Sequence, residues 1–142
     1  MRPKELKLAD VEHIAFHLAQ RLMEWDEPIP SFGTRFPDIL ESCLATPFQK
    51  YEKKYLYQGL IRKAANLFYL MIKNHPFQNG NKRIAMTTLL VLLHKNRKWL
   101  RAPQDKLYTF SIQVAGSFPD KRETILAGIE SFIRSHLISL PS

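Results

Sequence analysis

The chain has 142 residues, of which 45% are hydrophobic and 24% are charged, and its formal net charge at pH 7 is +8. This length suits one globular domain and is short for two. One cysteine, Cys43, excludes an internal disulfide and fits a reducing compartment. The longest uncharged apolar run, residues 84–93, is too short to span a bilayer. We therefore expect a cytoplasmic protein without a membrane segment.

The first element expected is an amphipathic helix. Its apolar residues recur at spacings of three and four: Val11, Ile14, Ala15, Leu18, Leu22 and Trp25. Asp10 is the expected N-cap. Pro28, Pro30 and Gly33 then interrupt the pattern, which predicts an extended loop over residues 27–36 with room for a small hairpin.

Helices are also expected along the rest of the chain. A short one over residues 37–45 ends before Pro47. A longer one carries Leu56, Leu60, Ala64, Leu67, Phe68 and Met71 on one face, and it ends near Pro76 because the residue before proline disfavours helix. Residues 82–98 are apolar on nearly every side, which predicts the buried centre of a bundle. With two more helices over residues 105–115 and 120–137, we predict an all-α single domain spanning residues 1–142.

The segment that separates the two longest of these helices, residues 75–83, carries the sequence HPFQNGNKR. A helix beginning near Gly80 would point its unpaired N–H groups at this turn. Lys82 and Arg83 add two cations, so the turn is suited to a polyanion such as the phosphates of a nucleotide. His75 could accept a proton from an attacking hydroxyl. Together these features indicate a phosphoryl or nucleotidyl transferase.

Residues 75–83 resemble the Fic/Doc signature, His-Pro-Phe-x-acidic-Gly-Asn-Gly/Lys-Arg. Eight of the nine positions agree, and the exception is Asn79, where the family usually has Asp or Glu. The helix predicted over residues 37–45 resembles one that precedes the signature in the family. The resemblance covers most of the chain, from Ala9 to Ile138. It implies a Fic-type helical bundle that transfers phosphate or AMP from ATP to a hydroxyl of a target protein.

The resemblance also implies a role for each signature residue. His75 would be the general base, since histidine exchanges protons near neutral pH. Gly80 would form the turn, and Asn81, Lys82 and Arg83 would bind phosphate. Doc-type toxins carry Lys where Lys82 stands and transfer the γ-phosphate, whereas members with Gly there generally transfer AMP. The two reactions stay open at this point.

Asn79 takes the place of the acidic residue that binds Mg²⁺ in the family. Mg²⁺ prefers charged oxygen ligands, and Asn79 offers a neutral carbonyl oxygen. We therefore expect Mg²⁺ to be bound weakly at this position. The alternative interpretation is a catalytically weakened or inactive Fic-fold module that binds a nucleotide or a protein.

Residues Pro30, Ser31, Phe32 and Gly33 resemble the flap of the family, which aligns an extended segment of the target beside the active site. An exposed loop could offer backbone hydrogen bonds to such a segment. The alternative is a simple connector between helices.

The chain also lacks a regulatory motif of the family. Fic enzymes are often inhibited by a helix of the form Ser/Thr-x-x-x-Glu-Gly/Asn, and no Glu of this sequence follows Ser or Thr at that spacing. We therefore expect a separate partner. The positive charge suits an acidic antitoxin, which makes this chain the toxin of a toxin–antitoxin pair. By resemblance, a translation factor is the expected target. A basic helical nucleic-acid-binding domain, suggested by charge alone, ranks last.

Overall fold

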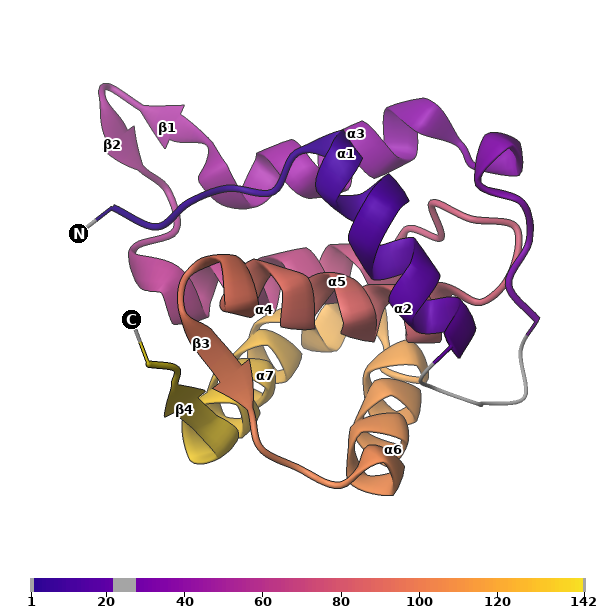
Figure 1. Ribbon diagram of the computed structural model, residues 1–142. Helices are drawn as coiled ribbons and strands as arrows, with labels where there is room; N and C mark the ends of the chain where they lie inside the picture. The colour runs from indigo at the N-terminus through magenta and orange to yellow at the C-terminus, as the bar shows by residue number, and fades with distance from the viewer. Residues whose placement is uncertain (1, 22–27, 142) are drawn as a thin grey trace.

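The fold is built around one buried helix, α5 (Asn81–Lys95), which lies at the centre of Figure 1. The computed structural model describes residues 2–21 and 28–141. From Asn81 to Leu93 every residue except Lys82 is buried, which confirms the predicted central helix and the all-α class. No helix of the described residues has both the length and the apolarity to cross a membrane.

The first helical segment consists of α1 (Leu8–Asp10), a π-helical turn (Val11–Ala15) and α2 (Phe16–Arg21). A π-helical turn is wider than an α-helical one, so the face that meets the core shifts along the segment. The residues buried there are Val11, Ala15, Phe16 and Ala19. Ile14, predicted on the buried stripe, is instead 47% exposed. The predicted stripe residues Leu22 and Trp25 lie outside the described residues.

Asp10 does not form the N-cap that the sequence predicted, because the helix begins earlier, at Leu8. Its carboxylate instead reaches back and accepts the backbone N–H of Lys7 at 2.8 Å. The same oxygen accepts a bond from Lys95 Nζ at 2.8 Å. Asp10 therefore caps α1 from within its first turn and ties it to the end of α5.

The described part of the following loop, residues 28–36, holds a 3-10 turn (Phe32–Thr34) and no strand, so the small hairpin considered for this loop does not lie there. Residue 27, the first residue of the predicted loop, lies outside the described residues. The loop ends where the Phe36 N–H donates to the Pro76 carbonyl at 2.8 Å. Helix α3 (Pro37–Ala45) then begins, with the bounds that the sequence predicted.

A hairpin that the sequence did not predict follows a second 3-10 turn (Thr46–Phe48). It pairs β1 (Lys50–Tyr51) with β2 (Lys54–Tyr55) antiparallel. The two turn residues between them both have positive φ, 50° and 68°, as a two-residue hairpin requires. These are Glu and Lys rather than the usual Gly or Asn, which is why the turn was missed. Leu56 consequently lies before α4 (Gly59–Lys73) and not on it.

Lys63 anchors this hairpin to α4. Its side chain is buried, and its ammonium donates to the Tyr57 carbonyl and lies 3.9 Å from the centre of the Tyr55 ring. Burial lowers the pKa of Lys63 because the charged form loses its hydration. The carbonyl and the ring compensate part of that loss.

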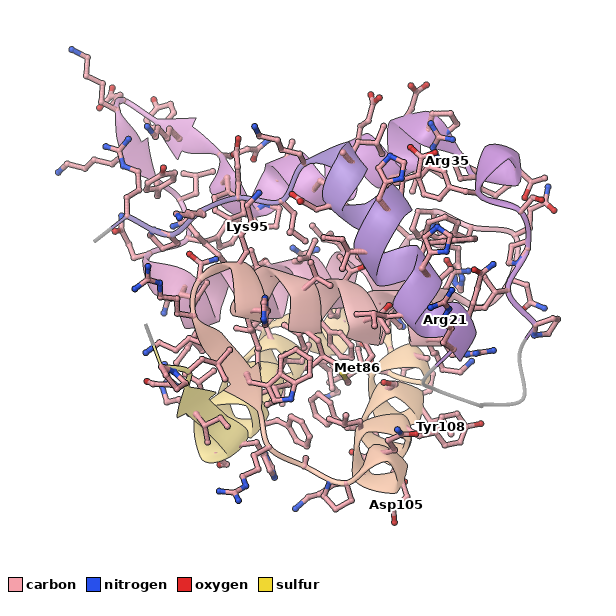
Figure 2. The ribbon with its side chains drawn as sticks, in the orientation of Figure 1. Arg21, Arg35, Met86, Lys95, Asp105 and Tyr108 are labelled. Atoms are coloured by element: carbon pink, nitrogen blue, oxygen red, sulfur yellow. The ribbon has the colours of Figure 1, made fainter. Side chains whose placement is uncertain are left out.

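The last third of the chain packs against both α5 and α4. It contains β3 (Lys98–Leu100), α6 (Gln104–Ala115), a 3-10 turn (Pro119–Lys121), α7 (Arg122–His136) and β4 (Leu137–Ser139). Figure 2 shows Met86, which is fully buried, between α5 and α6. The antiparallel pair of β3 and β4, with Trp99 opposite Ile138, was not predicted.

Candidate active site

The site begins where α4 ends. Asn74 closes the helix, and the next residue, His75, has φ +51°, in the left-handed region. A side chain other than glycine rarely adopts this conformation, and helix ends favour glycine for that reason. The His75 side chain is exposed, whereas Pro76 after it is buried. The backbone turn therefore presents the predicted base to solvent.

Phe77 anchors the turn in the core. It is 1% exposed, and its ring centre lies 5.8 Å from that of Phe16 and 5.9 Å from that of Phe32. The Phe16 and Phe32 rings meet edge to face at 5.3 Å. The three rings come from the signature turn, from α2 and from the predicted flap, so one aromatic cluster fixes all three segments.

Asn81 closes the turn on itself. Its Oδ1 accepts the Phe77 N–H at 3.0 Å, and its Nδ2 donates to the Phe77 carbonyl at 2.9 Å. Since the Phe77 N–H fixes the position of the oxygen, the amide NH₂ faces His75, whose Nδ1 is 3.4 Å away. That separation is near the outer limit of a hydrogen bond. Asn81 is therefore a positioning residue for His75, and its contact with phosphate stays a prediction.

Gly80 is the N-cap of α5 and has φ +73°. Its carbonyl accepts the Ile84 N–H at 3.0 Å, which opens the helix. A Cβ at this position would lie 2.7 Å from Ile29 Cδ1 and 3.0 Å from the Pro28 carbonyl oxygen. The turn therefore requires glycine for its backbone conformation and for the close approach of the loop. No sequence signal indicated that residues 28 and 29 approach Gly80.

Asn79, the substituted position of the signature, is exposed, and its Oδ1 accepts the Gly80 N–H at 2.9 Å. This oxygen is the only acceptor atom of the side chain and it is neutral, so it is a weaker ligand for Mg²⁺ than a carboxylate. Among the described residues, no group of three or more His, Cys, Asp or Glu could hold a metal ion. Binding of Mg²⁺ here together with the phosphates of ATP stays a prediction.

Lys82 and Arg83 occupy the first turn of α5. Arg83 is 7% exposed, and its guanidinium donates to the Ala19 carbonyl near the end of α2. This bond ties α2 to the start of α5, which sequence reasoning did not foresee. Lys82 is half-buried. The structure thus places both cations at the positive end of the helix dipole, and their contact with phosphate stays a prediction.

The predicted flap lies beside the signature turn. Ser31 and Gly33 are exposed, whereas Pro30 is half-buried and the Phe32 ring packs in the aromatic cluster. The Arg35 guanidinium lies 4.4 Å from the Phe32 ring centre and donates to the Phe32 carbonyl at 3.3 Å. Figure 2 labels Arg35 at this side of the molecule. Phe32 therefore anchors the loop, and docking of a target on it stays a prediction.

The comparison with protein families agrees with this geometry. The model of the Fic/DOC family matches residues 5–93, more than half of the chain. The match runs from the segment before α1 to the end of the buried part of α5. It contains every residue of the candidate site. No curated protein and no solved structure matches the chain.

Proposed function

Because the chain belongs to the Fic/DOC family, whose members are typically transferases, we propose that it transfers phosphate or AMP from ATP to a hydroxyl side chain of a target protein. One observation carries this proposal. The exposed His75 at the end of α4 lies 3.4 Å from Asn81 Nδ2 in the first turn of α5. Lys82 and Arg83 lie in the same turn, at the end of the helix whose dipole favours an anion.

In the proposed reaction, His75 accepts the proton of the target hydroxyl as that oxygen attacks a phosphorus atom of ATP. Attack on the α-phosphorus forms the new P–O bond to AMP and releases pyrophosphate. Attack on the γ-phosphorus transfers phosphate and releases ADP. Lys82 and Arg83 would stabilise the charge of the phosphates in either case.

The test is to incubate the protein with bacterial lysate, Mg²⁺ and ATP labelled separately at the α and γ positions. A labelled protein band that disappears with His75→Ala supports the proposal, and the position of the label identifies the group transferred. His13→Ala is the matched control, because His13 is also exposed and lies outside the site. Labelling that survives His75→Ala would contradict the role of His75.

A second function, a module that binds nucleotide with little or no turnover, is favoured by the hydrogen bond between Asn79 Oδ1 and the Gly80 N–H. Asn79→Asp restores the charged oxygen that the family uses. Labelling that appears only in Asn79→Asp would identify this module. Labelling by the unchanged protein would instead identify an enzyme that tolerates Asn79.

We further propose that the protein acts as a toxin, with a translation factor as its target, and that a separate acidic antitoxin restrains it. The net charge of +8 supports an acidic partner. Expression in a bacterial host should stop growth and protein synthesis, and His75→Ala should not. Growth arrest of equal strength with His75→Ala would separate toxicity from transfer and contradict this part of the proposal.

A further inference from the structure

A second candidate site lies at the end of the molecule where α4 begins, whereas the signature turn follows the other end of α4. The hairpin of β1 and β2 stands there, and Figure 1 shows it projecting from the helices on the side that carries the N and C labels. Residues 50–55 of this hairpin include three exposed lysines, Lys50, Lys53 and Lys54, and one carboxylate, that of Glu52. The hairpin therefore presents a net positive charge to solvent.

A cavity of about 470 Å³ beside the start of α4 extends this positive surface. The described residues that line it include Arg2, Arg97 and Lys98 and neither Asp nor Glu. The first two residues of α4 line it as well, and residues 56–58 are all that separates α4 from the hairpin. The cations of the hairpin and of the cavity together form the basic end, which consists of Arg2, Lys50, Lys53, Lys54, Arg97 and Lys98.

The cations of the basic end are not neutralised within the described part of the chain, where none of them forms an ion pair. Lys98 Nζ donates to Ser139 Oγ at 2.7 Å, and Lys50 Nζ lies 4.8 Å from the centre of the Tyr55 ring. A hydroxyl and a ring contact a cation without cancelling its charge. Like charges gathered on one surface repel each other, and an anionic partner removes that repulsion. The basic end therefore suits a partner with several negative charges.

Two of these cations lie on turns whose backbone favours other residues. Lys53 has φ +68° and Arg97 has φ +62°, both in the left-handed region. Glycine and asparagine adopt this conformation at less cost, so folding alone does not favour a cation at either turn. Strained backbone conformations are concentrated where side chains serve binding or catalysis. These two positions thus point to a role for their charges.

Tyr51 indicates which polyanion fits. It lies on β1 directly opposite Lys54 of β2, and 68% of its surface is exposed. Opposite residues of an antiparallel pair project from the same face, with their Cβ atoms about 5 Å apart. Single-stranded nucleic acids bind to such surfaces, because a base stacks on the exposed ring while a neighbouring phosphate meets the ammonium group. Charge alone would suit an acidic protein equally well, and the exposed ring beside Lys54 favours a nucleic acid.

We propose that the basic end binds single-stranded nucleic acid. One base stacks on the Tyr51 ring, and the phosphates on either side of it are held by Lys53 and Lys54. The strand continues toward Arg2 and Arg97 at the cavity. The proposal rests on the hairpin and the cavity and is independent of transfer at His75.

Fluorescence anisotropy of labelled oligouridylate of about twelve nucleotides, titrated with the full chain at several salt concentrations, tests the proposal. We expect the logarithm of the binding constant to fall linearly with the logarithm of the salt concentration, by about 0.7 for each phosphate contacted. An RNA duplex of the same length should bind at least about fivefold more weakly, because its bases cannot stack on Tyr51. Oligothymidylate shows whether the site distinguishes RNA from DNA. Equally tight binding of the duplex or of poly-L-glutamate, or no binding of either single strand, would overturn the proposal.

Two variants assign the binding to the basic end. Tyr51→Thr removes the ring and should weaken oligouridylate binding at least about fivefold without changing the salt dependence. Phe118→Thr is its matched control, because Phe118 is 72% exposed and lies between α6 and α7.

The double variant Lys53→Gln, Lys54→Gln removes two phosphate contacts and should reduce the salt dependence by about 1.4 on the same logarithmic scale. The double variant Lys106→Gln, Lys121→Gln removes the same charge from exposed positions outside the basic end and serves as its control. All four variants replace exposed side chains, and circular dichroism verifies that each is folded. If the Tyr51 and Lys53/Lys54 variants bound no more weakly than their controls, the strand would lie elsewhere and the proposal would be wrong.

Discussion

At the scale of single residues, the backbone of His75 connects stability to the proposed chemistry. Its φ of +51° is a conformation that glycine adopts readily and that other residues adopt at a free-energy cost. The turn holds this conformation because Phe77 is buried and because Asn81 binds both backbone groups of Phe77. Folding alone therefore does not favour a histidine at this position.

Replacing His75 separates these two contributions. His75→Ala and His75→Gly should both abolish ATP-dependent labelling, because neither side chain accepts a proton. In urea unfolding, His75→Gly should be more stable than His75→Ala by about 1 kcal/mol, since glycine relieves the left-handed strain. Equal free energies of unfolding for the two variants would show that the turn relaxes when the imidazole is removed.

Gly80 allows a similar test with a control from the same chain. Gly80→Ala should lower the free energy of unfolding by about 1–3 kcal/mol, because φ is +73° and the added Cβ meets the backbone oxygen of Pro28 at 3.0 Å. Gly128 lies within α7, and an added Cβ there meets no atom within 4 Å. Gly128→Ala should therefore raise stability by up to about 1 kcal/mol. Urea unfolding measures both stability changes. If Gly80→Ala stabilised the protein as Gly128→Ala does, the strained and crowded backbone described at Gly80 would be wrong.

At the scale of elements, the Asp10 carboxylate ties α1 to the end of α5. Burial raises the pKa of Asp10, but the hydrogen bonds from Lys95 and Lys7 and the charges of both lysines outweigh it, so the pKa is lowered overall. Because the folded pKa lies below the unfolded one, the stabilisation is complete above the ordinary value of 3.8 and is lost as the pH falls through the folded pKa.

Asp10→Asn measures this attachment. At neutral pH the free energy of unfolding of the variant should be about 1–2 kcal/mol lower than that of the unchanged protein, because Lys95 loses its charged hydrogen-bond partner. The difference should shrink as the pH is lowered below 3.8, where Asp10 itself becomes neutral. Urea unfolding at a series of pH values gives the curve. A difference that stays constant into acid would mean that Asp10 acts through the shape of its side chain alone.

The elements that could be predicted from sequence are those specified by local pattern. The uncharged apolar run over residues 84–93 predicts α5, and Pro37 and Pro47 set α3 between its bounds. The pairing of β3 with β4 could not be predicted, because it joins Trp99 to Ile138 across the whole length of α6 and α7. Likewise, the signature residues were predicted as a set, but the clamp of Asn81 on Phe77 depends on a turn geometry that no residue type specifies.

At the scale of the whole molecule, Cys43 reports on global unfolding. Its side chain is fully buried in α3, and burial raises the pKa of the thiol to about 11, although a hydrogen bond with Asn74 acts in the opposite direction. A neutral buried thiol does not react with alkylating reagents.

We therefore expect the folded protein to react with a thiol reagent at least about a thousandfold more slowly than the urea-unfolded chain, in proportion to its unfolded fraction. The rate should rise with urea concentration along the unfolding curve measured by circular dichroism. Fast labelling that does not depend on urea would instead identify local opening of α3.

Both ends of the described chain meet at one end of α5. The Lys4 N–H donates to Asn96 Oδ1 at 2.7 Å, and the Leu140 N–H donates to the Arg97 carbonyl at 2.9 Å. Figure 1 shows the N and C labels together on the side away from the loop that joins α4 to α5. An affinity tag or a fluorescent fusion at either end would therefore stand clear of His75. Two dyes placed at the two ends would report release of either terminal segment from the end of α5 without touching the signature turn.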